Sequence, residues 1–187
     1  MSVTRALYID GEWVETDDSI ENINPSDTTE SVGRYAQATP ELADHAIASA
    51  NRAAKEWGQS PMETRYQMLM AIGTELIDRS AELGELLARE EGKTRAEGVG
   101  EVVRSGQFFH YFAAEVHRQI DDRVDSVRPG IEIETRREPI GVVAVISPWN
   151  FPMATADWNI APALAFGNAV SFKPANLGPA SAWALTG

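Results

Sequence analysis

An apolar run followed by a proline-bracketed turn constrains most strongly what this chain can fold into. Residues 140–146 are nearly all β-branched or small, which is typical of a strand buried on both faces of a parallel sheet. The segment Ser147-Pro148-Trp149-Asn150-Phe151-Pro152 follows directly. Proline fixes its own φ and restricts the residue before it, so this turn should be rigid. Because open α/β sheets bind ligands at the carboxyl ends of their strands, the turn is a candidate site.

The pattern after this turn predicts a helix over residues 161–166, a second buried strand over residues 170–172 and a helix from Gly178. Strand, helix, strand and helix in this order form a βαβ unit, which indicates an α/β fold. Both strand ends should then lie on one edge of the sheet.

Two parallel strands alone do not make a stable doubly wound sheet, so the chain is expected to be cut short. Phe166, Phe172 and Trp183 should then pack against strands that it lacks. Exposed apolar patches and open strand edges should favour aggregation.

The first 120 residues read as a hairpin followed by packed helices. The hairpin is predicted at residues 7–14, where Asp10-Gly11 suits a type I′ turn. Helix starts are indicated by an N-cap at Thr39 before Pro40, a capping box at residues 60–63, a cap at Ser80 and a capping box at residues 94–97. Residues 131–135 then alternate between apolar and polar, as in a half-exposed strand.

Composition excludes several classes of function. The 187 residues carry a net charge of −12, and an acidic, lysine-poor surface repels nucleic acid and anionic membranes. The charge has two interpretations, general solubility or adaptation to a high-salt cytoplasm, and we favour the second. No apolar h-region follows Met1, and the apolar stretch at residues 140–172 is interrupted, so we expect a cytoplasmic protein without a membrane span.

The chain has no cysteine, which leaves no disulfide, no thiolate metal site and no thiol nucleophile. His110 and His117 lie seven residues apart on one predicted helix, too far for an ordinary pair of metal ligands. We therefore expect no metal.

Two side chains at the predicted strand ends could carry chemistry. Asn150 could stabilise an oxyanion on a carbonyl, or could simply bond nearby backbone as a turn asparagine. Lys173 could bind ribose hydroxyls or a phosphate, or could be a solvated surface lysine. Their common position at one sheet edge favours the functional interpretation of both.

The motifs taken together resemble the aldehyde dehydrogenase superfamily. The resemblance is carried by the segments Glu138-Pro139-Ile140-Gly141, Ser147 to Pro152, Ile160-Ala161-Pro162-Ala163-Leu164, Gly167-Asn168 and Lys173-Pro174-Ala175, and upstream by Tyr8 to Trp13, Asn24-Pro25 and Glu90 to Thr94. It covers essentially the whole chain, in the family's order and spacing. It implies the N-terminal part of the aldehyde dehydrogenase fold, truncated, with helices and the start of a Rossmann-like parallel sheet.

The resemblance also implies roles for residues. The asparagine matching Asn150 donates its amide to the thiohemiacetal oxyanion, and the lysine matching Lys173 contacts the adenosine ribose. The backbone of Ile146, Ser147, Pro148 and Trp149 lines the cleft for NAD or NADP. The domains implied are residues 1–125 and 139–187, both parts of the cofactor-binding domain, and residues 126–138, an oligomerisation segment that implies a homodimer or homotetramer.

Asn176 departs from the glutamate of many NAD-preferring members. A carboxylate there would repel the 2′-phosphate of NADP, so an amide predicts tolerance of NADP. The residues around Asn176 and the segment Ser181-Ala182-Trp183-Ala184-Leu185 are similar to those of the branch that acts on 2,5-dioxopentanoate (2-oxoglutarate semialdehyde).

Three hypotheses follow. The chain is the N-terminal segment of an NAD(P)-dependent enzyme that oxidises an aldehyde to a carboxylate, and is inactive alone because the nucleophilic cysteine and general-base glutamate are missing. Alternatively, it is a non-catalytic module that binds cofactor or pairs with intact subunits. The third is an incomplete gene or record, which we favour over a natural non-catalytic module.

Overall fold

The computed structural model describes residues 4–118 and 121–186. The predictions that begin at Met1 or end at Gly187 therefore extend beyond the described residues. The N-terminal part contains β1 (Thr4–Arg5), β2 (Leu7–Ile9), β3 (Glu12–Val14), β4 (Ser19–Ile23), β5 (Ser31–Ala36), α1 (Pro40–Gly58), α2 (Met62–Asp78), α3 (Ser80–Glu91) and α4 (Arg95–Val116). The rest contains β6 (Asp122–Asp125), β7 (Glu132–Thr135), β8 (Val142–Ile146), α5 (Ala154–Ala165), β9 (Ala169–Lys173) and α6 (Pro179–Thr186).

The first 40 residues form more sheet than the sequence predicts. The β2–β3 hairpin is confirmed, with Asp10 at φ 57° and Gly11 at φ 81° in its turn. However, β1, β5 and β4 form a separate three-stranded sheet in that order, so the description of a hairpin followed only by helices is wrong. These strands were not recognised because they are short and carry charged residues.

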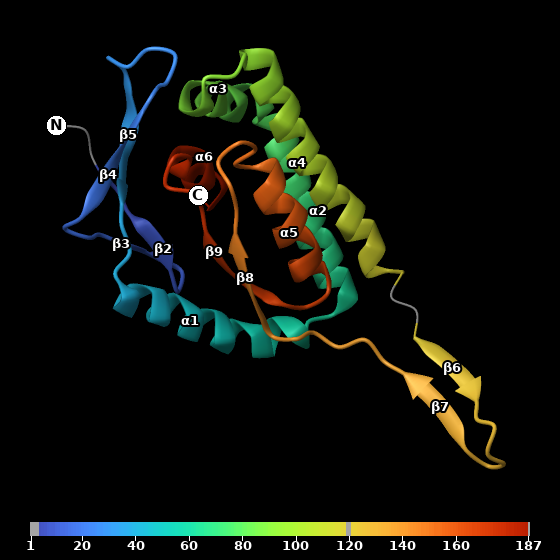
Figure 1. Ribbon diagram of the computed structural model, residues 1–187. Helices are drawn as coiled ribbons and strands as arrows, with labels where there is room; N and C mark the ends of the chain where they lie inside the picture. The colour runs from blue at the N-terminus through green and yellow to red at the C-terminus, as the bar shows by residue number, and fades with distance from the viewer. Residues whose placement is uncertain (1–3, 119–120, 187) are drawn as a thin grey trace.

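Helices α2, α3, α4 and α5 enclose the main hydrophobic core, beside the β8–β9 sheet in Figure 1. Its fully buried side chains include Leu87, Val102 and Phe109. Helices α2 and α4 approach closely because two glycines face each other: a Cβ on Gly106 would lie 2.6 Å from the carbonyl oxygen of Gly73. Any larger residue at this crossing would push the helices apart.

The predicted helix caps are only partly correct. Thr39 caps α1, and Thr94 with Glu97 forms the predicted capping box at α4. The capping box at residues 60–63 is wrong, since Pro61 is the N-cap residue of α2 and the Ser60 hydroxyl donates to the Trp57 carbonyl instead. The Ser80 cap is also wrong, because Arg79 takes the N-cap position of α3 without a side-chain bond.

The predicted βαβ unit is confirmed, since β8 and β9 pair in parallel around α5. Helix α5 begins at Ala154, seven residues before the predicted start, and includes Pro162. The expectation of a strand buried on both faces is wrong for β8: only Val145 is buried, and Ile146 is 77% exposed. In the described chain no further strand pairs with β8 or β9, so the outer edges of this sheet stay unpaired.

Strands β6 and β7 form a hairpin that projects away from the body of the molecule (Figure 1). Every residue of both strands is exposed, so the prediction of a half-exposed strand at residues 131–135 is wrong. The alternation is real, but among the described residues neither face of the hairpin is covered.

Trp183 also departs from its expected role. Its ring packs against Trp13 at a centroid distance of 5.1 Å, Arg5 lies over it, and its Nε1 donates to the carbonyl of Ala6. Trp183 therefore packs α6 against the N-terminal strands. The prediction that it packs against strands absent from this chain is wrong. Phe166, by contrast, remains 38% exposed.

Within residues 4–118 and 121–186, no helix is both long and apolar enough to cross a membrane.

Candidate functional site

The two predicted strand ends meet at one edge of the β8–β9 sheet. Ile146 is the register partner of Lys173, so the last residues of the parallel strands lie side by side. Ser147 is buried, while Pro148, Trp149 and Asn150 beyond it are exposed. The turn thus starts inside the fold and reaches the surface over three residues, next to Lys173.

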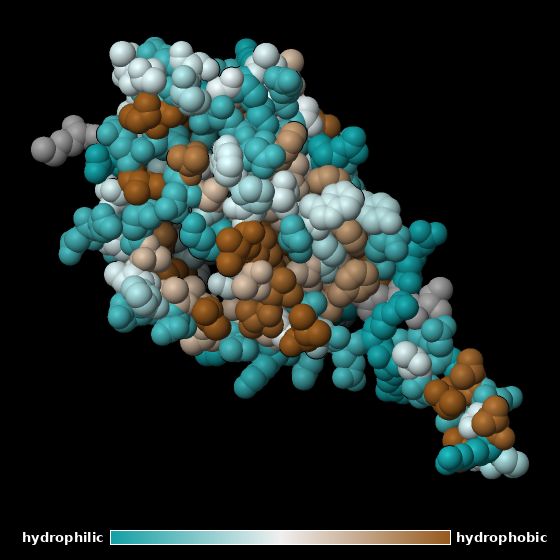
Figure 2. Space-filling model, viewed as in Figure 1, coloured by the Kyte–Doolittle hydropathy of each residue, from teal (hydrophilic) through white to brown (hydrophobic). Residues whose placement is uncertain are grey.

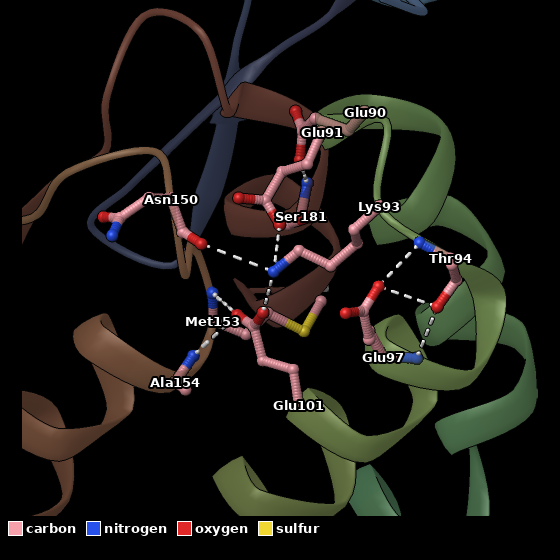
Figure 3. Close-up of polar contacts among 10 residues, drawn as sticks. All are labelled: Glu90, Glu91, Lys93, Thr94, Glu97, Glu101, Asn150, Met153, Ala154 and Ser181. Carbon is pink, nitrogen blue, oxygen red and sulfur yellow. Dashed lines mark hydrogen bonds and ion pairs between the residues drawn. The ribbon is translucent and has the colours of Figure 1, made fainter. Parts of the chain in front are cut away.

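Asn150 presents its side-chain amide outward. Its backbone carbonyl accepts a hydrogen bond from Lys93 Nζ at 3.3 Å, while its amide points away from that lysine (Figure 3). Among the described residues, the amide itself forms no hydrogen bond, so it is not a turn asparagine bonded to nearby backbone. The amide is available to an acceptor from outside the chain.

Lys93 gathers four groups around the turn. Its ammonium lies 2.7 Å from Glu101 and 2.5 Å from Glu91, donates to the Asn150 carbonyl, and sits 4.4 Å from the centroid of the Phe151 ring. Burial opposes its charge, but the hydrogen bonds to Glu101 and Glu91 outweigh burial and raise the pKa of Lys93. Lys93 is therefore a permanent cation beneath the turn.

Glu101 extends the same contact to the start of α5. One carboxylate oxygen binds Lys93, and the other accepts from the backbone N–H groups of Met153 at 3.1 Å and Ala154 at 3.2 Å. These are donors of the first turn of α5, which has no side-chain cap of its own. A negative charge at this helix end also interacts favourably with the helix dipole.

A second helix start is capped in the same way. Glu90 is buried, and its two carboxylate oxygens accept from the N–H groups of Ala180 at 2.6 Å and Ser181 at 2.8 Å at the start of α6. Burial raises the pKa of Glu90, and the bonds from Ser181 and Ala180 offset part of this rise. Burial likewise raises the pKa of Glu91 to about 7, against the opposing effect of Lys93.

Lys93 and Glu101 were not among the predicted residues of this site. The available signal was a carboxylate at Glu101 directly beside the apolar stripe residue Val102 of α4. A charged residue on a buried helix face requires a partner. Besides Lys93, its partners are the N–H groups of Met153 and Ala154, which lie 52 and 53 residues away and could not be found from local patterns.

Lys173 and Asn176 form the second polar group of this edge. Lys173 Nζ donates to Asn176 Oδ1 at 2.8 Å and to the Pro174 carbonyl at 2.7 Å, and both side chains are exposed. The structure therefore brings together Ile146 and Lys173, and Lys173 and Asn176. In the described part of the chain, no group of three or more His, Asp or Glu residues could hold a metal ion.

The aldehyde dehydrogenase family matches residues 13–187. The chain belongs to this family. It is 41% identical over 174 residues to the α-ketoglutarate semialdehyde dehydrogenase of Haloferax volcanii, and 38% identical over 174 residues to the α-ketoglutaric semialdehyde dehydrogenase of Bacillus subtilis. Each match covers 92% of this chain and 36% of the relative, so the chain spans about a third of their length.

Solved structures of aldehyde dehydrogenases share this fold. The betaine aldehyde dehydrogenase of Staphylococcus aureus, in complex with NAD+, is 34% identical with a TM-score of 0.93, covering 97% of this chain and 37% of that one. The NADP-dependent glyceraldehyde-3-phosphate dehydrogenase of Bacillus halodurans C-125, complexed with NADP, is 32% identical with a TM-score of 0.93, covering 98% and 40%. The chain is thus an N-terminal segment of the fold of NAD(P)-linked oxidoreductases.

Proposed function

We propose that this segment supplies the oxyanion donor and part of the cofactor site of an enzyme that oxidises an aldehyde to a carboxylate. The observation that carries the proposal is the exposed Asn150 side-chain amide, which lies on the turn that follows β8 at the carboxyl edge of the parallel strands, the edge at which β9 ends in Lys173. Preorganised donors at such a position can lower an acyl-transfer barrier by about 3–4 kcal/mol.

The chemistry needs a thiolate that these 187 residues do not contain. Attack of a thiolate on the aldehyde carbonyl would place negative charge on the carbonyl oxygen, and the Asn150 amide would donate to that oxygen. The chain alone should therefore not turn over. A bound nicotinamide cofactor would supply the hydride acceptor, and water would then release the carboxylate from the resulting thioester.

The residues present fit the ribose end of NAD(P). Lys173 is an exposed ammonium whose position is fixed by Asn176 and the Pro174 carbonyl, which suits hydrogen bonds to ribose oxygens. The backbone of Ile146, Ser147, Pro148 and Trp149 would line the adjoining cleft. Asn176 carries no charge to repel a 2′-phosphate, so both NAD and NADP are expected to be accepted.

The substrate we propose is 2,5-dioxopentanoate. Both relatives named above carry α-ketoglutarate semialdehyde in their names, at 41% and 38% identity. The domain division at residues 1–125, 126–138 and 139–187 belongs to the same proposal. We also propose that the protein forms a homo-oligomer through the β6–β7 hairpin and that it is cytoplasmic. The net charge of −12 supports a high-salt environment.

Cofactor contact can be tested on the chain itself. In an NMR titration of the 15N-labelled chain with NAD+, the largest shifts should fall on the backbone amides of residues 146–149 and 173–176. Lys173→Met should reduce the affinity about tenfold, while Lys55→Met, which removes an exposed lysine from α1, should not. Shifts scattered away from both strand ends would count against the proposed site.

Turnover provides the second test. The purified chain should form no NAD(P)H with 2,5-dioxopentanoate, and aldehyde-dependent NAD(P)H formation would contradict the assignment of roles above. The alternative, a module that pairs with intact subunits, predicts co-purification with a full-length family enzyme. The observation that supports this alternative is the lack of cysteine, because a chain without a thiol nucleophile cannot catalyse the reaction alone.

A further inference from the structure

The Asn150 turn raises the question of what holds it in place. The side-chain amide of Asn150 makes no hydrogen bond to the described residues, and Pro148, Trp149 and Asn150 are all exposed. Pro152 has no N–H to contribute. An oxyanion donor must nevertheless be fixed before the reaction, because a small misplacement costs much of the rate. The two prolines restrict the backbone of the turn, but they do not fix its position relative to the rest of the fold, so that part of the restraint must come from other elements.

Lys93 contacts the turn before Pro152. It reaches the carbonyl of Asn150 and the ring of Phe151 from the loop between α3 and α4, 57 residues away in sequence. Its side chain is 17% exposed, and its ion-pair partners Glu91 and Glu101 are 6% and 2% exposed. Such shielding makes the contact stronger than a surface ion pair.

Glu101 contacts the chain after Pro152. It accepts from the N–H groups of Met153 and Ala154, and the same carboxylate binds Lys93 at 2.7 Å. The Lys93–Glu101 ion pair thus contacts the two residues before the proline, Asn150 and Phe151, and the two residues after it, Met153 and Ala154. Figure 3 shows its contacts with Asn150, Met153 and Ala154. The side-chain amide of Asn150 is the part of this region that the pair leaves free.

We propose that Lys93 and Glu101 are positioning residues for Asn150. Lys93 binds the turn at residues 147–152 before Pro152, and Glu101 binds the first residues of α5 after it, so that together they hold the turn in place. The inference rests on the proposed function for the role of Asn150, but the restraint itself is a property of this chain. Neither residue touches the reacting atoms. Their effect on the reaction would pass through the orientation of the Asn150 amide.

The restraint can be measured by NMR relaxation on the chain without any cofactor. In the unmodified chain, backbone order parameters at Asn150 and Phe151 should be those of a rigid segment, about 0.85. Lys93→Met should lower them below about 0.6 and speed amide exchange at Met153 and Ala154 at least tenfold, while Lys93→Arg should largely restore both. Exchange at Leu76 and Phe109 in the core should not change, and Lys55→Met should change nothing.

The double variant Lys93→Met/Glu101→Gln removes both charges and so avoids leaving a carboxylate buried without its partner. It keeps an amide oxygen as a weaker cap for α5, and should loosen the turn in a chain that still folds. Unchanged order parameters at Asn150 in this variant would overturn the proposal. Faster exchange spread over the whole core would also overturn it, because the pair would then stabilise the fold in general.

A kinetic cycle separates positioning from general stability. In a full-length family enzyme that begins with residues 1–187, Lys93→Met should lower kcat about tenfold or more and leave KM within twofold. In an Asn150→Ala background the same change should have no further effect, because its target is gone. Equal losses in both backgrounds would overturn the positioning role. If Asn150→Ala itself left kcat unchanged, the proposed function would fail while the relaxation data still reported on the restraint.

Discussion

Asp157 is an ionisable residue that is completely buried. It lies on α5, is 0% exposed, and neither carboxyl oxygen has a hydrogen-bond partner among the described residues. Burial raises its pKa to about 8, and the negative charge of Glu101 adds to the rise. An unpaired buried carboxylate is costly, so the protonated acid is the form that the fold favours.

Replacing Asp157 with asparagine should stabilise the chain at high pH. The folded-state pKa lies above the ordinary 3.8, so this group stabilises the fold most below about pH 4, and the stabilisation is lost as pH rises to about 8. Asp157→Asn should be more stable than the unmodified chain by about 2–4 kcal/mol at pH 9, and similar to it at pH 4. Urea unfolding across this range checks the prediction, with Asp44→Asn on the surface of α1 as control. The same pH slope in both chains would contradict it.

Asn176 should decide how well a 2′-phosphate is accepted. Asn176→Glu places a carboxylate beside Lys173, where it would repel a phosphate and neutralise the ammonium. We expect the affinity for adenosine 2′-monophosphate to fall about tenfold, about 1.4 kcal/mol, with little change for adenosine. Calorimetric titration with both ligands measures the ratio. Asn159→Glu, on the exposed side of α5, is the matched control, and an equal loss for both ligands would argue against charge repulsion.

Residues with local signals were found from the sequence, and residues with distant partners were not. Asn150 and Lys173 follow apolar strands directly, so their positions at a sheet edge could be inferred. Lys93 and Glu101 become part of the site only through contacts across 52 to 57 residues. The burial of Asp157 follows from the packing of α4 against α5, which no short window of sequence contains.

At the level of helices, local and distant caps behave differently. The Thr94 hydroxyl accepts from the N–H of Glu97, and the Glu97 carboxylate accepts from the N–H of Thr94, whereas Ser80 makes no capping bond. Thr94→Ala should therefore destabilise the chain by about 1 kcal/mol, and Ser80→Ala by less than about 0.5 kcal/mol. Thermal melting of the two variants compares them directly. A larger loss for Ser80→Ala would show that the sequence-based cap was correct after all.

The start of α5 shows why some helix ends escape prediction, whereas α6 begins at Pro179, where the Gly178-Pro179 pair predicted a helix. The first N–H groups of the two helices are satisfied by Glu101 and Glu90, which lie on α4 and α3. A helix capped from another element needs no serine, threonine or aspartate at its own start. For this reason the start of α5 was placed seven residues late, while α1 and α4, which carry their own threonine caps, were placed correctly.

At the scale of the molecule, the net charge of −12 should make stability depend on salt. Self-repulsion destabilises a compact acidic chain, and salt shortens the range of this repulsion from about 10 Å at 0.1 M to about 3 Å at 1 M. Raising KCl from 0.1 to 2 M should therefore raise Tm by about 5 °C or more. The variant Glu12→Gln/Asp44→Asn/Glu56→Gln, with three fewer exposed charges, should gain less. A Tm that is flat in salt would favour the solubility interpretation over adaptation to high salt.

The projecting hairpin makes self-association the expected behaviour of the whole molecule. Apolar side chains gather on the β6–β7 hairpin in Figure 2, where Val124 is 55% and Ile133 is 48% exposed. Patches on an uncovered hairpin mark contact surfaces, and its free strand edges can pair with another chain. The chain should therefore elute as a concentration-dependent oligomer in size-exclusion chromatography with light scattering.

Ile133→Glu should shift this equilibrium to the monomer at least tenfold, because it places a charge on the hairpin without touching the body of the fold. Ile47→Glu is a close control, since Ile47 is 46% exposed on α1. If Ile47→Glu dissociated the oligomer equally well, association would be a general effect of added charge. If neither variant did, the unpaired edge of the β8–β9 sheet and its exposed end at Ile146, which is 77% exposed, would be the contact surface instead. The hairpin is the stronger candidate because both its faces and both its edges are exposed in the described chain, whereas α1 and α5 both pack against the β8–β9 sheet.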